Sequence, residues 1–349
     1  FWGIGNEPWG DWQLGFMPVA QFALKHDQFA RAMLAVDPSI ELIAGGATPD
    51  TMAGSKQSQR INGQIVPEYL SPADWSGSLL KHSLDNIDYL SEHFYSRSNQ
   101  KLDLEKGEKV EVEFTLIEWM RQPATQVRAK VEHYREYEKL IPGLKEKPVP
   151  ISLDEWAYTG SPRDGYKVVP AYAWVFHEMF RHSGVYQIGG FTFGTSLVAS
   201  NRTDAVLNPT GLLFELYSNH FGSIPVGVSG NSPQPKPEYP AGGDQPAVNP
   251  GSPTYPLDVA AALSGDRSTL TIAVINPSDE EQQLDLSISG VSPAGAGTMR
   301  RRAPDSLDAA IAVGEAPGVE IEEIALDRVP GSVAISPFSV GVYELPLER

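Results

Sequence analysis

The chain has 349 residues, 41% of them hydrophobic, which is enough for the core of one large domain or two ordinary ones. It contains no cysteine, which excludes disulfides and thiolate metal sites but leaves the compartment open, cytoplasmic or secreted. The formal net charge of −17 argues against nucleic acid and anionic membranes as partners, because both present negative charge to the protein. A neutral sugar polymer would be indifferent to this charge.

The first ten residues contain the first functional signal. The apolar run from Phe1 to Ile4 predicts the end of a buried strand, and Pro8 and Gly10 predict a turn after it. Asn6 and Glu7 lie between these two features. In a parallel α/β barrel the carboxyl ends of the strands form the active site, so such a strand would present both side chains to a substrate. Taken alone, however, an Asn-Glu pair would more often be a solvated strand end.

Two helices and a short strand are predicted next. Residues 21–36 carry apolar side chains at helical spacing, which indicates an amphipathic helix. Residues 40–44 predict a short buried strand, and residues 48–59 have the composition of a loop. Residues 72–84 predict another helix, on which we expect Trp75 to belong to the core.

A strand predicted over residues 87–94 leads into His93 and Tyr95. By themselves these two residues are typical of a structural strand end. Lys and Glu alternate in residues 97–111, a pattern that predicts a charged surface loop. Residues 114–140 then have helical spacing, with Pro123 as a predicted break.

The second functional signal is an apolar strand over residues 148–159 that ends in Asp154 and Glu155. Glycoside hydrolysis needs two carboxylates facing one cleft, one as proton donor and the other as nucleophile or base. Glu7 and Glu155 at strand ends match this requirement. Glu118, which also precedes a Trp, lies inside a helical pattern, and we interpret it as structural.

The helix predicted over residues 166–182 carries His177 and His182. Their spacing of five is wrong for a helical metal pair, so we predict no metal site. A further strand over residues 186–193 and a short helix over residues 211–218 complete this part of the chain.

The composition changes from residue 221 onward. Pro and Gly crowd residues 229–255, a stretch too long for a compact connection, which predicts an excursion or partial disorder. Arg300 to Arg302 form a basic cluster that we interpret as a loop and not as a partner site. Alternating runs predict an all-β region with short strands at 257–263, 269–276, 283–288, 318–325 and 332–345.

The two carboxylate motifs carry a resemblance to a known family. Gly5-Asn6-Glu7 and Asp154-Glu155-Trp156 resemble the acid/base and nucleophile motifs of clan A glycoside hydrolases. The surrounding sequence is most similar to the family 51 α-L-arabinofuranosidases, and residues 11–15, 36–42 and 336–340 are also similar to that family. The resemblance spans the whole chain, although it is tight only at the motifs.

The resemblance implies an α/β plus all-β architecture. Residues 1–220 would form the C-terminal part of a catalytic (β/α)8 TIM barrel, strands four to eight, and residues 221–349 a jelly-roll-like β-sandwich with the Pro/Gly-rich loop at 229–255. Glu7 would close strand four and Glu155 strand seven. Strands one to three would then lie outside the chain.

The resemblance also implies a role for each site residue. Glu7 would be the acid/base and Glu155 the nucleophile of a retaining double displacement, with the pKa of Glu7 raised toward neutral by the like charge of Glu155. Asn6 would bind the sugar 2-hydroxyl. His93 and Tyr95 would border the nucleophile, and a hydrogen bond from the Tyr95 hydroxyl would hold down the nucleophile's pKa.

Three tryptophans are candidates for stacking on a sugar face, and Trp156 is the best placed because it directly follows the nucleophile. Trp9 and Trp12 are the other two. Ala157 and Pro8 depart from the family's usual Asn and Met. Both lie at the rim of the sugar site. The sequence therefore supports retaining hydrolysis more strongly than it supports arabinofuranose as the sugar.

The predicted function is therefore a retaining α-L-arabinofuranosidase that releases arabinofuranose from plant-type polysaccharides or oligosaccharides, with a carbohydrate as its partner and no cofactor. Two alternatives stay open: another clan A glycosidase, such as a galactofuranosidase or an endo-β-glycanase, or a catalytically incomplete fragment. The sequence also leaves open whether the protein is a homo-oligomer.

Overall fold

The computed structural model describes residues 1–53, 55, 60–65, 68–97, 99–159, 165–192, 197–304, 306–315 and 318–348. Part of the loop predicted at residues 48–59, and the end of the strand predicted at 186–193, lie outside the described residues. In the described part of the chain, no helix has the length and apolar character needed to cross a membrane.

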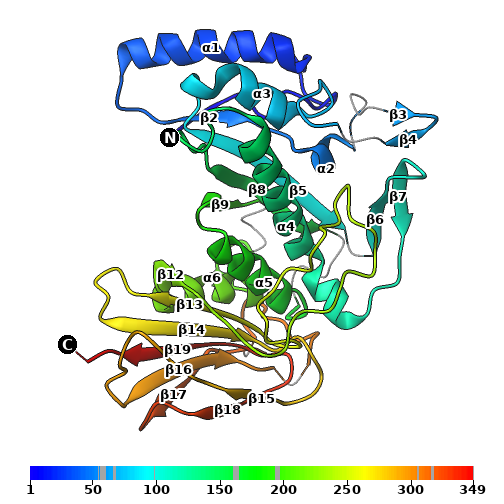
Figure 1. Cartoon of the computed structure of the whole chain (residues 1–349). Coiled ribbons are helices and arrows are strands. Elements are labelled where there is room, and N and C mark those ends of the chain that lie inside the picture. The colour runs from blue at the N-terminus through cyan, green and yellow to red at the C-terminus, as the bar shows by residue number, and fades with distance from the viewer. Residues whose placement is uncertain are drawn as a thin grey trace.

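Five strands of the N-terminal part form one sheet whose spatial order follows the chain order, and all neighbouring strands are parallel (Figure 1). The strands are β1 (Trp2–Ile4), β2 (Leu42–Gly45), β5 (Tyr89–Arg97), β8 (Ile151–Thr159) and β9 (Tyr186–Phe191). Parallel neighbours need crossover connections, and long helices supply them. These helices are α1 (Val19–Val36), α3 (Trp75–Ser83), α4 (Leu116–Leu140) and α5 (Val168–Arg181).

Helices α3 and α4 begin where side chains cap them. The carboxylate of Asp74 accepts a hydrogen bond from the Gly77 amide at the start of α3. At the start of α4, Thr115 and Glu118 form a reciprocal capping box. Glu118 is therefore structural, as the sequence indicated. Trp75 is fully buried in the core, also as expected.

Pro123 does not break α4, contrary to the sequence-based prediction. A proline inside a helix leaves the carbonyl four residues earlier without its usual N–H partner. Here that carbonyl belongs to Trp119, and the hydroxyl of Tyr158 on β8 donates a hydrogen bond to it at 2.7 Å. A tertiary contact thus replaces the bond that the proline removes.

Residues 100–111 form a β-hairpin, whereas the sequence predicted a surface loop over residues 97–111. Its strands are β6 (Gln100–Asp103) and β7 (Glu108–Glu111). Leu102 is buried on one side of the hairpin, and its amide donates to Asp244, which lies in the Pro/Gly-rich segment. The burial of this single leucine gives the charged stretch an inner face, which the alternation of Lys and Glu concealed.

Smaller elements flank this sheet. They are α2 (Pro49–Met52), β3 (Arg60–Ile61), β4 (Gln64–Ile65), the short 3-10 helix η1 (Leu84–Asn86), β10 (Val198–Ser200), β11 (Ala205–Leu207) and α6 (Pro209–His220). Asn208 caps α6 by accepting a hydrogen bond from the Gly211 amide.

The C-terminal part forms an antiparallel sheet of β12 (Ile224–Val226), β13 (Asp258–Leu263), β14 (Thr269–Ile275), β19 (Val340–Pro346), β16 (Gly297–Arg302) and β17 (Glu322–Leu326), in that spatial order. A second, two-stranded sheet consists of β15 (Gln282–Asp285) and β18 (Ser332–Ile335). Apolar side chains of both sheets pack together: Leu284 and Val333 lie against a buried cluster that includes Val259 and Ile272.

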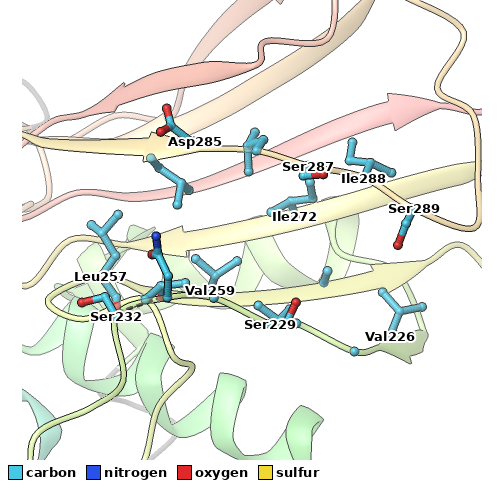
Figure 2. A pocket seen from close by; sticks show the side chains of 18 of the residues that line it. Val226, Ser229, Ser232, Leu257, Val259, Ile272, Asp285, Ser287, Ile288 and Ser289 are labelled. Atoms are coloured by element: carbon cyan, nitrogen blue, oxygen red, sulfur yellow. Dashed lines mark hydrogen bonds between the residues drawn. The ribbon is translucent and has the colours of Figure 1, made fainter.

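A cavity of about 750 Å³ opens between these two layers (Figure 2). Its floor is apolar and includes Leu257, Val259 and Ile272, whereas Ser287 and Ser289 line the side formed by the segment after β15. None of its lining residues belongs to β1, β5 or β8.

The basic cluster at residues 300–302 belongs to strand β16, so the predicted loop is wrong. Arg300 forms ion pairs with Glu323 and Glu344. Arg302 is fully buried and donates a hydrogen bond to the Pro209 carbonyl at the start of α6. The arginines find acidic and carbonyl partners on neighbouring elements, which the one-dimensional pattern does not reveal.

Residues 229–255 make the expected excursion, from β12 of the antiparallel sheet back along α4 (Figure 1). The carboxylate of Glu132 on α4 accepts a hydrogen bond from the Ala247 amide at 2.8 Å. Arg121, also on α4, donates to the Gln234 side chain at 2.9 Å. These contacts, together with that of Asp244, attach the segment to the α/β part along its length.

Candidate active site

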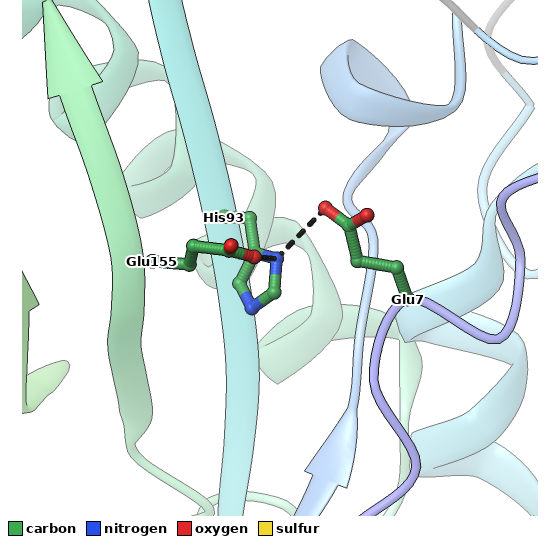
Figure 3. A group of neighbouring side chains, drawn as sticks. All are labelled: Glu7, His93 and Glu155. Carbon is green, nitrogen blue, oxygen red and sulfur yellow. Dashed lines mark hydrogen bonds and ion pairs between the residues drawn. The ribbon is translucent and has the colours of Figure 1, made fainter. Parts of the chain in front are cut away.

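Three side chains from three parallel strands of the α/β sheet converge on one point (Figure 3). Glu7 follows β1, His93 lies on β5 and Glu155 lies on β8. One carboxylate oxygen of each glutamate and a ring nitrogen of His93 all lie within 4.8 Å of one another. The structure therefore brings together the two carboxylates that the sequence singled out.

The backbone that carries Glu7 has an unusual conformation. Gly5 has φ +82°, and Glu7 itself has φ 43°, a left-handed conformation that side chains other than glycine seldom adopt. Strain of this kind persists only where surrounding contacts hold it, and it concentrates at functional sites. Gly10 ends the turn closely packed: a Cβ there would lie 2.6 Å from the Trp12 ring.

A bulge in β8 directs two consecutive carboxylates toward the same ring. In the pairing of β5 with β8, Ser91 lies opposite Ser152 and His93 opposite Glu155, so two steps on β5 match three on β8. Side chains of a regular strand alternate between faces, but an extra residue resets the alternation. Asp154 and Glu155 both contact His93 as a result.

Both ring nitrogens of His93 face acidic groups. Nδ1 lies 2.9 Å from Glu7 Oε1 and 2.6 Å from Glu155 Oε2. Nε2 lies 3.3 Å from Asp154 Oδ1. Burial disfavours the charged ring, but the bonds to Asp154, Glu155 and Glu7 outweigh it and raise the pKa of His93 to about 11. His93 is therefore a cation at neutral pH.

The pKa of Glu7 is lowered, which contradicts the sequence-based expectation of a raised one. Burial raises this pKa, but hydrogen bonds from His93, Trp12 and Gln13 to the carboxylate lower it by more. The like charge of Glu155 alone would raise the pKa of Glu7. The His93 imidazolium lies between the two carboxylates and stabilises the charge on both.

The pKa of Glu155 is also lowered, first by the hydrogen bond to His93 and then, against the effect of burial, by the hydrogen bond from Tyr95. The Tyr95 hydroxyl thus acts on Glu155 in the direction that the resemblance implies. The like charge of Glu7 raises the pKa of Glu155, but it is the weakest of these influences.

The other expected site residues lie elsewhere. Trp156 is 1% exposed and packs against Phe94 and Phe191 in the core, so its ring cannot stack on a sugar, contrary to expectation. It points away from Glu155 because successive side chains of a strand alternate between faces. Asn6 is exposed and lines a hollow next to α1.

The sequence did not assign Gln13, Ser91 and Asp154 to roles in the site, and it considered Trp12 only for stacking on a sugar. Trp12 and Gln13 donate hydrogen bonds to Glu7 Oε2, at 2.7 and 3.3 Å. Ser91 and Asp154 surround Nε2 of His93. Asp154 had a signal, its place beside Glu155, but a regular strand would have pointed it to the other face.

Glu7, His93 and Glu155 each offer an atom of a type that can bind a metal ion. A histidine ligates a metal through an unprotonated nitrogen, however, and both nitrogens of His93 face carboxylate oxygens as donors. The arrangement is that of a proton shared among carboxylates, and it does not fit a metal site.

The chain is similar in sequence to two arabinofuranosidases. The chain is 24% identical over 307 residues to intracellular exo-α-(1→5)-L-arabinofuranosidase 1 of Bacillus subtilis, covering 83% of the chain and 54% of that protein. It is 26% identical over 314 residues to α-L-arabinofuranosidase C of Emericella nidulans, covering 84% of the chain and 55% of that protein. No protein-family model matches the chain.

The fold aligns with the crystal structure of the α-L-arabinofuranosidase from Thermotoga maritima in complex with arabinose. The TM-score is 0.72 at 22% identity, covering 99% of this chain and 66% of that one. In sequence the chain is similar to α-L-arabinofuranosidases, and its fold is similar to those of family 51 α-L-arabinofuranosidase structures. It spans about half the length of the curated relatives it matches.

Proposed function

We propose that this chain carries the two catalytic carboxylates of a retaining α-L-arabinofuranosidase. The distance between Glu7 and Glu155 supports the proposal most strongly. Their nearest oxygens lie within 4.8 Å, close to the ~5–5.5 Å of retaining glycosidases and well short of the ~6.5–9.5 Å of inverting ones. At this distance there is no room for a water molecule between an inverting base and the sugar.

The fold is consistent with this function. We assign β1, β2, β5, β8 and β9 to strands four to eight of a (β/α)8 barrel, with the domain boundary near residue 220 and a β-sandwich from residue 221 onward. Glu7 and Glu155 would then lie at the carboxyl ends of strands four and seven. Active sites of such barrels lie at this edge.

Glu155 would attack the anomeric carbon, and Glu7 would pass a proton to the departing glycosidic oxygen. The lowered pKa of Glu155 keeps it ionised for attack. Nδ1 of the protonated His93 lies 2.9 Å from Oε1 of Glu7. As Glu155 forms its bond to the sugar it loses its negative charge, which weakens the hold on the imidazolium proton and favours its transfer to Glu7. In the second step Glu7 would accept a proton from the attacking water.

We infer the substrate from the similarity to the two relatives, which are α-L-arabinofuranosidases. The test uses the intact protein that contains this chain, with aryl α-L-arabinofuranoside, aryl galactofuranoside and aryl β-pyranosides as substrates. We expect preference for the arabinofuranoside, and NMR of the first-formed sugar should show the α-anomer. A first-formed β-anomer would contradict the retaining mechanism, and preference for another sugar would contradict the substrate.

Variants assign the roles. Glu155→Ala should abolish turnover of every substrate. Glu7→Ala should spare the first step for substrates with good leaving groups, and azide should rescue its slow second step, because the anion needs no general base. Equal loss on aryl and polymeric substrates without azide rescue would refute the acid/base role of Glu7. Glu118→Ala is the matched control, since that glutamate only caps α4.

A further inference from the structure

We propose that Asp154 and Ser91 are positioning residues that hold the His93 ring as a charged bridge between Glu7 and Glu155. This inference rests on the function proposed above, because it concerns how that catalytic pair is organised. Neither residue needs to touch the substrate for this role.

The contacts around Nε2 carry the argument. The Ser91 hydroxyl donates to Asp154 Oδ1 at 2.8 Å, and its oxygen lies 3.2 Å from His93 Nε2. The same Asp154 oxygen lies 3.3 Å from Nε2. One ring nitrogen is thus held by a serine and a carboxylate, and this fixes the ring plane. The opposite nitrogen, Nδ1, is thereby directed at both glutamates.

The bulge in β8 brings Asp154 and Glu155 to the same histidine ring. Without the extra residue, Asp154 and Glu155 would point to opposite faces of the sheet. With it, a single ring lies between a carboxylate at Nε2 and two carboxylates at Nδ1. A Cβ at position 190 would lie 3.0 Å from the Asp154 carbonyl oxygen, so the neighbouring strand also confines the bulged backbone.

The charge on the ring depends on Asp154. The titratable groups that face His93 are Glu7 from the loop after β1 and Asp154 and Glu155 from β8, with Tyr95 of β5 bound to Glu155. An amide at position 154 could donate to Nε2, which would favour a neutral ring with hydrogen at Nδ1 alone. Losing the positive charge would raise the pKa of both glutamates.

The test compares Asp154→Asn and Ser91→Ala in the intact protein, with Ser152→Ala as matched control. Ser152 is the ladder partner of Ser91, but among the described residues its buried hydroxyl has no hydrogen-bond partner. The first readout is NMR of ¹⁵N-labelled histidine at pH 7, which needs no activity. We expect both His93 nitrogens to be protonated in the wild type and in Ser152→Ala, and only one in Asp154→Asn.

The second readout is the pH profile of kcat/KM on an aryl α-L-arabinofuranoside. Asp154→Asn should lower kcat/KM on the order of 10–100-fold, and the acidic limb should move to higher pH because the nucleophile loses a stabilising cation. Ser91→Ala should cause the same changes to a smaller extent.

A neutral His93 ring in the wild type, or wild-type NMR and pH profile in Asp154→Asn, would overturn the proposal. Ser91→Ala removes only a hydroxyl and gives the same readouts if the Asn variant does not fold. Should the proposed hydrolase activity itself fail, the NMR comparison still decides whether Asp154 keeps the ring charged.

Discussion

Nε1 of Trp12 lies 2.7 Å from Oε2 of Glu7, so an exposed tryptophan donates a hydrogen bond to the proposed acid/base carboxylate. The two residues lie in the same turn after β1, five positions apart. The bond stabilises the charged form of Glu7 and contributes to its lowered pKa. The turn that positions the carboxylate thus also adjusts its acidity.

Trp12→Phe keeps the aromatic ring but removes this donor. The pKa of Glu7 should rise, because its carboxylate loses a hydrogen bond that stabilises the charged form. The measurement is a titration of the Glu7 carboxyl group by ¹³C NMR in the wild type and in the variant. Trp2→Phe is the control, because Trp2 is comparably exposed on β1. An unchanged titration of Glu7 in Trp12→Phe would show that the bond does not matter for acidity.

Asp258 at the start of β13 joins the antiparallel sheet to helix α5 through a buried ion pair. It contacts His177 Nδ1 at 2.8 Å and Arg181 on α5, and its pKa is held well below the usual range: burial opposes the charge, but Arg181 and His177 outweigh it. Removing one partner of a buried pair leaves an uncompensated charge. Asp258→Asn should therefore lower the free energy of unfolding by about 3–5 kcal/mol.

The pH dependence of this effect has a defined sign. A carboxyl with a lowered folded-state pKa stabilises the protein above its unfolded-state pKa, and the contribution is lost as pH falls. The difference between Asp258→Asn and the wild type in urea unfolding should thus be full at pH 7 and shrink below about pH 4. Asp266→Asn, in the exposed turn after β13, should change stability much less. A small, pH-independent effect at Asp258 would contradict this account.

Tyr158 and Pro123 should be energetically coupled, although they do not share a hydrogen bond. Tyr158→Phe leaves the buried Trp119 carbonyl without a partner, at an expected cost of about 1–3 kcal/mol in unfolding free energy. In a Pro123→Ala background the restored amide can bond that carbonyl, so the same change should cost less. A double-mutant cycle by urea unfolding measures the coupling. Equal costs in both backgrounds would refute it.

The edge of the α/β sheet at β1 exposes large apolar side chains. Phe1, Trp2 and Leu14 are 69%, 59% and 106% exposed. Unpaired strand edges with apolar side chains promote association. Residues 1–349 expressed alone should therefore self-associate in a concentration-dependent way during light scattering, and hydrolyse aryl arabinofuranosides slowly. Trp2→Lys should reduce association and Val248→Lys, on the distant excursion, should not. A monomeric, fully active chain would contradict this expectation.

Local patterns in the sequence predicted much of the framework. The apolar runs before Glu7 and Glu155 predicted β1 and β8, because a buried strand is a property of neighbouring residues. The same holds for α1, for the core position of Trp75 and for Glu118 at a helix start. Glu7 follows β1 as expected, whereas Glu155 lies within β8, which continues to Thr159, and not at a strand end. The resemblance of the two motifs to a family then placed Glu7 and Glu155 in one site.

Other features depend on residues that only the fold brings together. His93 and Glu7 are 86 positions apart, and their contact reversed the expected direction of the Glu7 pKa. The extra residue in β8 is visible only against β5, yet it turns Asp154 toward the same ring as Glu155. Pro123 remains helical because Tyr158 supplies a donor from another strand. Burial, electrostatics and strand register depend on distances in space, and a linear pattern of residue types does not contain those distances.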